Sequence, residues 1–116
     1  PMALDGSLPE AVSRTRLVVN CTPVGMEGSE ARLPLPLDAL PFTNEHVVYD
    51  LVYNPRRTPL LERAAVAGAR TLDGMGMLVR QGARALGIWT GREAPVETMR
   101  RAAIEALGAR PGAGKR

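Results

Sequence analysis

Aromatic residues and cysteines are scarce in this sequence. The 116 residues include one Trp, one Phe, two Tyr and one Cys. The core must therefore be aliphatic, built from Val, Leu, Ala and Met. The single Cys21 excludes an intrachain disulfide framework and a cysteine-based zinc site. Because no histidine accompanies Cys21 in any motif, we expect a small buried residue there rather than a nucleophile.

Long apolar runs are also lacking. No run approaches the roughly 20 residues that span a bilayer, and no signal peptide is recognisable. We therefore expect a cytoplasmic protein without a membrane partner. The length of 116 residues allows one small domain with a modest core. The chain begins with Pro1-Met2, and we expect it to be part of a longer protein.

A basic surface is missing too, although the sequence pI is about 9.8. Three of the 15 basic residues lie in the tail 109–116, which leaves 12 basic against 12 acidic residues in the body of the chain. No basic stripe with interleaved aromatic residues is present, so no nucleic-acid partner is expected.

The hydrophobic periodicity predicts three short strands and four helices. The expected strands are residues 17–19, 46–53 and 70–72, and the expected helices are residues 7–14, 58–68, 75–86 and 95–108. Ser7 and Glu10 form a capping-box pattern, and Thr58-Pro59 is an N-cap followed by a proline in the first helical position. The Pro- and Gly-rich stretch 27–44 is expected to be a long connection.

The order of these elements favours a parallel sheet with helical crossovers. Three strands make a poor domain alone, but they make a good half of a doubly wound nucleotide-binding fold. We therefore predict an α/β fold, a partial doubly wound (Rossmann-like) parallel sheet with flanking helices. Residues 1–108 would form this half-domain with its closing helices, and residues 109–116 a disordered basic tail.

Three turn-rich segments follow the expected strands. In open α/β sheets, ligands bind beyond the carboxyl ends of the strands, where residues 20–25, 50–58 and 73–81 would lie. Each segment combines polar groups with glycine or proline, which suits a loop that forms a site. Any one of them alone is better interpreted as an ordinary connection.

Taken together, the segments resemble the shikimate dehydrogenase family. Residues 20–25, Asn-Cys-Thr-Pro-Val-Gly, resemble its Asn-Ala-Thr-Pro/Ser-x-Gly signature. Residues 50–60 resemble its Asp-x-x-Tyr-x-Pro-x-x-Thr-x-Leu segment, and residues 73–81 its Asp-Gly-Leu-x-Met-Leu-x-x-Gln motif. Residues 89–91 match the Trp-Thr-Gly that follows. The resemblance covers roughly residues 8–107, with Cys21 and Met75 as mild departures from the usual alanine and leucine.

The resemblance implies the C-terminal, NADP-binding half of an oxidoreductase that reduces 3-dehydroshikimate to shikimate with NADPH. The glycine-rich phosphate loop, the loop that selects NADP and the family's catalytic Lys-Asp pair have no counterpart in this sequence. No catalytic residue is therefore expected in this chain, which alone should be inactive. Two alternatives stay open: a quinate/shikimate dehydrogenase paralogue using NAD or NADP, and a non-catalytic binding module derived from the enzyme.

Two side chains are implied to bind the substrate. Tyr53 would donate its hydroxyl to the carboxylate of shikimate or to a nearby hydroxyl, and Gln81 would hydrogen-bond a ring hydroxyl. Without the resemblance, Tyr53 is better interpreted as a core tyrosine and Gln81 as an exposed helix residue.

Five positions are implied to contact the cofactor: Asn20, Thr22, Leu51, Gly74 and Met77. Leu51 and Met77 would pack against the nicotinamide ring, and Gly74 would let the backbone approach it closely. Asn20 and Thr22 would line the cofactor groove. The competing interpretations are that Met77 is core filler and Gly74 a turn glycine.

Three further residues carry weaker expectations. His46, the only histidine, is expected to be structural or exposed. Arg56 and Arg57 would clamp the cofactor phosphates or, more simply, be solvated in their loop.

We also expect a homo-oligomer, most simply a two-fold dimer, because the strand 17–19 would lack a neighbour on one side.

Overall fold

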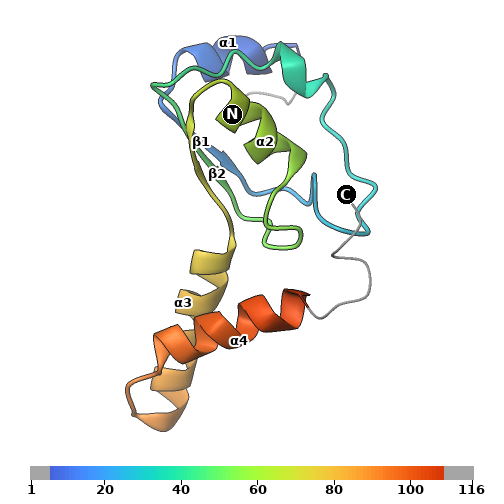
Figure 1. Cartoon of the computed structure of the whole chain (residues 1–116). Helices are drawn as coiled ribbons and strands as arrows, with labels where there is room; N and C mark the ends of the chain where they lie inside the picture. The colour runs from blue at the N-terminus through green and yellow to red at the C-terminus, as the bar shows by residue number, and fades with distance from the viewer. Residues whose placement is uncertain (1–5, 109–116) are drawn as a thin grey trace. The chain divides into compact units, whose positions relative to one another are not determined.

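The structure, a computed structural model, describes residues 6–108 (Figure 1). An α-helix connects β2 to β3, whereas a long connection with one 3-10 turn joins β1 to β2. Its elements are α1 (Leu8–Ser13), β1 (Leu17–Asn20), the 3-10 turn η1 (Leu37–Ala39), β2 (Val47–Asp50), α2 (Pro59–Val66), β3 (Arg70–Leu72), α3 (Met75–Thr90) and α4 (Val96–Gly108). The chain divides into two compact units, of which the first ends at Asp73 and the second begins at Gly74. The tail predicted to be disordered, 109–116, lies outside the described residues.

The first unit contains a three-stranded, fully parallel sheet in the order β1-β2-β3. This confirms the α/β class and the parallel sheet expected from the sequence. In the β1–β2 register Asn20 lies opposite Asp50, so both polar residues stand at the carboxyl end of the sheet. Strand β2 is shorter than the expected 46–53, because the backbone N–H of Val52 turns back to Asp50 Oδ1, at 3.0 Å.

Within the first unit, helices cover one face of this sheet. Seven buried residues form the core on that face: Val12, Leu40, Phe42, Val48, Leu60, Leu61 and Ala64. They come from α1, α2, β2 and the connection before β2. Figure 1 shows α2 beside β1 and β2. On the opposite face Leu17, Val19 and Leu72 are 59%, 41% and 51% exposed. Strand β1 is therefore exposed or half-buried along its whole length.

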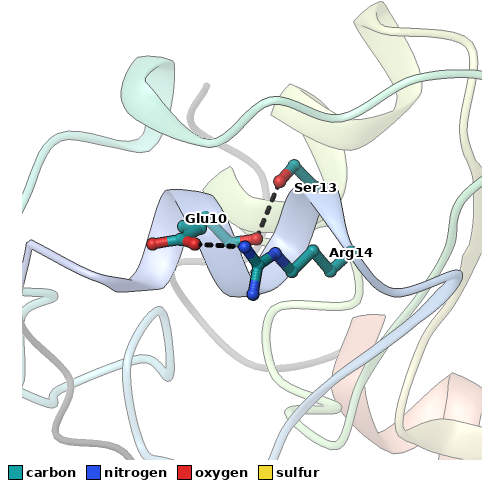
Figure 2. A network of polar contacts seen from close by, with 3 residues as sticks. All are labelled: Glu10, Ser13 and Arg14. Atoms are coloured by element: carbon teal, nitrogen blue, oxygen red, sulfur yellow. Dashed lines mark hydrogen bonds and ion pairs between the residues drawn. The ribbon is translucent and has the colours of Figure 1, made fainter.

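Helix α1 forms as expected, but the predicted capping box does not. Ser7 precedes the helix without a side-chain cap hydrogen bond, since its backbone is already helical, with φ −83° and ψ −11°. A capping residue needs an extended backbone. The carboxylate of Glu10 pairs instead with Arg14 Nη2 at 2.7 Å, and Ser13 Oγ donates to the carbonyl of Glu10 at 2.7 Å (Figure 2).

Helix α2 has the cap that the sequence predicts. Thr58 has an extended backbone, with φ −83° and ψ 156°, and its hydroxyl accepts from the backbone N–H of Leu61 at 3.3 Å. Pro59 fills the first helical position, where its missing N–H removes no helical hydrogen bond. The helix ends before Gly68, whose φ of +83° suits a residue without a Cβ.

The second unit pairs two helices, of which α3 is longer than predicted. It continues through Gly87 and ends at Gly91, which adopts the left-handed conformation with φ +66°. Gly87 has a different role, since a Cβ there would lie 3.4 Å from the carbonyl oxygen of Arg92. Helix α4 begins at Val96, one residue after the expected start, and extends to Gly108 as expected. The methyl of Met99 in α4 would lie 3.5 Å from a Cβ at Gly82 in α3.

The burial of His46 and of Cys21 tests what the sequence predicted for these two residues. His46 is structural and only 5% exposed: Thr43 N–H donates to Nδ1 at 3.0 Å, so Nε2 carries the hydrogen and donates to the carbonyl of Val12 at 3.1 Å. Cys21 is exposed, so the expectation of a buried cysteine was wrong. It follows directly after β1, where the chain has already left the sheet.

Candidate functional site

A buried carboxylate holds the carboxyl end of the sheet together. Asp50, at the end of β2, is 0% exposed. Its Oδ1 accepts from Asn20 Nδ2 at 2.9 Å and from the backbone N–H of Val52 at 3.0 Å, and its Oδ2 accepts from Thr58 Oγ1 at 2.6 Å. These three donors replace the water that a buried carboxylate loses. They also connect β1, the loop after β2 and the start of α2.

The loop after β1 is organised by Asn20 and Thr22. Besides its bond to Asp50, Asn20 Nδ2 donates to the carbonyl of Val24 at 3.2 Å, and Oδ1 accepts from Thr22 N–H at 3.0 Å and Thr22 Oγ1 at 2.6 Å. The hydroxyl of Thr22 accepts in turn from Val24 N–H at 3.2 Å. The polar atoms of both side chains thus bind inside the protein, where they shape the loop.

Gly25 brings this loop against the start of α2. Its φ is +84°, and a Cβ there would lie 3.4 Å from the Cβ of Thr58. A side chain at this position would be strained by the backbone conformation and would lie in contact with Thr58, which is 0% exposed. The loops after β1 and β2 therefore meet at Thr58.

The loop between β2 and α2 carries Leu51 and Tyr53. Leu51 is half-buried, and its N–H donates to the carbonyl of Asn20 at 3.0 Å. Tyr53 is 39% exposed, so its interpretation as a core tyrosine is wrong. The next residue, Asn54, anchors the loop from outside: its Nδ2 donates to Glu27 Oε2 at 2.6 Å, and its carbonyl accepts from Glu27 N–H at 2.9 Å.

Arg56 connects the same loop to the end of the sheet. Its Nε lies 2.8 Å from Asp73 Oδ2, directly after β3. Arg56 is thus paired with Asp73 but remains exposed, as is Arg57, so both arginines are accessible to solvent. An open cavity of about 280 Å³ in the first unit is lined by Arg56, Arg57, Leu61, Glu62, Ala65, Thr71 and Asp73. Since two arginines and two acids line this cavity, their formal charges balance.

The second unit carries the remaining predicted positions at the start of α3. Gly74 is buried and precedes α3 with φ −74° and ψ −7°, so it does not serve as a left-handed turn glycine. Met77 is 41% exposed, which contradicts its interpretation as core filler. Gln81 is exposed one turn further on, and its Nε2 donates to the carbonyl of Leu78 at 3.0 Å. Residues four apart on a helix share a face.

The role of Asp50 was not predicted from the sequence. Asn20 brings Thr22 and Leu51 together at the carboxyl end of β1 and β2, because its Oδ1 accepts from Thr22 and its carbonyl accepts from Leu51 N–H. The Asp50 side chain then joins Asn20 to Val52 and Thr58. Thr58 was identified only as a helix cap. A signal was present, because Asp50 and Thr58 are both fixed letters of the segment 50–60 that resembles the family motif.

Two kinds of site or segment are absent from residues 6–108. Nowhere in that range do three His, Cys, Asp or Glu side chains gather as a metal ion would require. Within the same range, every helix is too short or too polar to cross a bilayer.

Comparisons with known proteins agree on one family. The profile of the shikimate 5′-dehydrogenase C-terminal domain matches residues 74–104. The chain is 50% identical over 107 residues to shikimate dehydrogenase (NADP(+)) of Methanopyrus kandleri, covering 91% of this chain and 37% of that protein. The chain thus spans little more than a third of the length of the curated relatives it matches.

Solved structures show the same partial coverage. Shikimate 5-dehydrogenase from Thermus thermophilus, in complex with NADP(H) and shikimate, aligns with a TM-score of 0.70 and 37% identity over 90% of this chain and 37% of that one. Quinate dehydrogenase from Corynebacterium glutamicum, in complex with NAD, aligns with a TM-score of 0.74 and 34% identity over 84% of this chain and 34% of that one.

Proposed function

The chain belongs to the shikimate dehydrogenase family, as part of its C-terminal region, and from that premise we propose that it forms the substrate- and cofactor-binding end of an NADP-dependent shikimate dehydrogenase. The complete enzyme would reduce 3-dehydroshikimate to shikimate with NADPH. The observation that carries this proposal is the 50% identity over 91% of the chain to an NADP-dependent relative. The family-like segments 20–25, 50–60 and 73–81 begin at or directly after the last residues of β1, β2 and β3, where α/β folds bind ligands.

Tyr53 and Gln81 are the proposed substrate contacts. Both are exposed, so their polar groups are accessible to a ligand. Tyr53 would donate to the carboxylate of shikimate or a nearby hydroxyl. Gln81 would bind a ring hydroxyl, because its amide can both donate and accept. The bond from Gln81 Nε2 to Leu78 is local to the helix, so a ligand can replace it at small cost.

The residues present suit the nicotinamide end of NADP. Leu51 and Met77 offer apolar surface for the ring, since Leu51 is half-buried and Met77 is 41% exposed. Gly74 presents backbone without a Cβ. Asn20 and Thr22 support the cofactor indirectly, because their polar atoms hold the loop after β1. When bound, the cofactor supplies the hydride, and this chain's residues supply orientation.

The remaining parts of the reaction are proposed to lie outside this sequence. It contains no glycine-rich loop to hold the pyrophosphate and no counterpart of the family's Lys-Asp pair, which moves the hydroxyl proton. We therefore expect the 116 residues alone to orient ligands without turning them over.

A quinate dehydrogenase that uses NAD is the second candidate, favoured by the similarity to the Corynebacterium glutamicum enzyme. Steady-state kinetics of the complete enzyme would separate the two, with shikimate or quinate and with NADP or NAD. We expect the highest kcat/KM with shikimate and NADP. A higher value with quinate and NAD would favour the second candidate, and no turnover with any pair would favour a non-catalytic binding module.

A further inference from the structure

The loop that carries Leu51 and Tyr53 is fixed at both ends by one carboxylate. At its start, the N–H of Val52 donates to Asp50 Oδ1 at 3.0 Å. At its end, Thr58 Oγ1 donates to Asp50 Oδ2 at 2.6 Å. Residues 51–57 therefore form a closed loop whose two ends meet at Asp50.

Burial makes this closure strong. Asp50 and Thr58 are each 0% exposed, so water cannot replace a bond that is lost between them. The hydroxyl of Thr58 is used twice, since it donates to Asp50 and accepts from Leu61 N–H at 3.3 Å. An unmet hydrogen-bonding group in such a place costs far more than an exposed one. The loop cannot shift without breaking a bond in the interior.

From this geometry we infer that Asp50 and Thr58 are positioning residues, which fix the loop 51–57 so that Tyr53 meets the substrate in one orientation. The inference rests on the proposed function for its substrate. The clamp, by which we mean the two hydrogen bonds that Asp50 accepts from Val52 N–H and Thr58 Oγ1, is a property of the chain itself. The hydrogen bond between Asp50 and Thr58 explains why these two residues, eight positions apart, occur on either side of Tyr53 in the segment 50–60. Neither side chain can reach a ligand, because both are buried.

The chain offers a matched set of variants to test the clamp. Thr58→Val keeps the shape of the side chain but removes the hydroxyl, whereas Thr58→Ser keeps the hydroxyl. Leu40→Ala is the control for general destabilisation, since Leu40 is 2% exposed in the same core and makes no contact with Asp50 through hydrogen bonds.

Limited trypsin digestion of the 116-residue chain measures the clamp directly. Trypsin cuts after arginine, so the Arg56–Arg57 bond reports opening of the loop, and the Arg32–Leu33 bond in a separate loop serves as the reference. Thr58→Val removes both hydrogen bonds of the Thr58 hydroxyl, to Asp50 and from Leu61 N–H, and we expect it to raise the cleavage rate at Arg56 about tenfold relative to Arg32. Thr58→Ser should restore the ratio, and Leu40→Ala should leave it unchanged.

Kinetics of the complete enzyme measure the consequence for the substrate. Thr58→Val should lower kcat/KM for shikimate by about tenfold to hundredfold, because misplacing a binding group by a fraction of an ångström is costly. Thr58→Ser should recover the activity, while Leu40→Ala should lower the melting temperature only.

The outcomes separate the clamp from the proposed function. The inference is overturned if Thr58→Val opens the loop no more than Leu40→Ala does. It is also overturned if folded Thr58→Val with an open loop keeps the wild-type kcat/KM. If the loop opens as expected but the wild-type enzyme does not act on shikimate, the clamp stands and the proposed function alone fails.

Discussion

Tyr53 and Gln81 are exposed, unlike the polar side chains at the ends of β1 and β2. The side chains of Asn20, Thr22 and Asp50 bind one another, and so their hydrogen-bonding capacity is used inside the protein. Tyr53 and Gln81 are exposed, and removing either polar group leaves no buried partner without a hydrogen bond. Substitutions at these two positions should therefore change ligand binding without changing stability.

Tyr53→Phe removes only the phenolic hydroxyl. We expect kcat/KM for shikimate to fall by about tenfold to hundredfold in the complete enzyme, as the loss of one hydrogen bond in a closed site implies. The thermal melt should be unchanged, since Tyr53 is 39% exposed. A lower melting temperature together with normal kinetics would show that the tyrosine has a packing role.

Gln81→Ala tests the second substrate contact. The amide of Gln81 donates to the carbonyl of Leu78 within the same helix, and alanine favours helix formation. We expect normal or slightly raised stability and a loss of about tenfold to hundredfold in kcat/KM for shikimate. Gln81→Glu is the control, because it keeps the size and the acceptors but loses the donor. Wild-type kinetics for both variants would contradict the contact.

The ends of helix α2 could be predicted from neighbouring residues, whereas the end of helix α3 depends on tertiary packing. Pattern and cap chemistry were enough for α2, where Thr58 and Gly68 mark both ends. They failed for α3, because Gly87 and Gly91 look alike in the sequence. Only the packing of the following turn shows that Gly87 admits the carbonyl of Arg92 while Gly91 reverses the chain.

Gly91→Ala should show which glycine ends α3. Its φ of +66° is left-handed, and an alanine there costs about 1 kcal/mol in the free energy of unfolding. Gly91→Asn should cost less, because asparagine tolerates this conformation. Chemical denaturation of the 116-residue chain measures both. Equal stability of Gly91→Ala and the wild type would mean that the helix does not end in this conformation.

The capping box at Ser7 failed for a related reason. Its letters are correct, but the backbone of Ser7 is helical, and Glu10 pairs with Arg14 at 2.7 Å instead (Figure 2). A four-residue pattern does not record the backbone angle that decides whether the cap forms. The candidate site was likewise predictable only in part. The motif residues located its loops, but the buried position of Asp50, which joins these loops, is seen only in the folded structure.

Within the first unit, one face of the sheet carries exposed apolar side chains. Leu17, Val19 and Leu72 lie on it with 59%, 41% and 51% of their surface exposed. Central strands of parallel sheets are normally covered on both faces. The 116-residue chain should therefore self-associate, most simply as a two-fold dimer, as apolar surfaces of this kind do.

Sedimentation velocity at micromolar concentration measures this association. Val19→Lys should shift the chain toward the monomer, because a charge on the open face opposes burial. Val66→Lys is the matched control: Val66 is 86% exposed on α2, away from that face, and should have no effect. A monomeric wild-type chain, or equal behaviour of the two variants, would contradict association through the sheet.

Shikimate-dependent formation of NADPH tests the central claim most directly, measured side by side for the complete enzyme and the 116-residue chain. The proposed function predicts turnover by the complete enzyme and none by the chain alone, because the chain lacks a phosphate loop and a Lys-Asp pair. No turnover by the complete enzyme would contradict the assigned reaction. Turnover by the 116 residues alone would contradict the placement of the catalytic residues outside this chain.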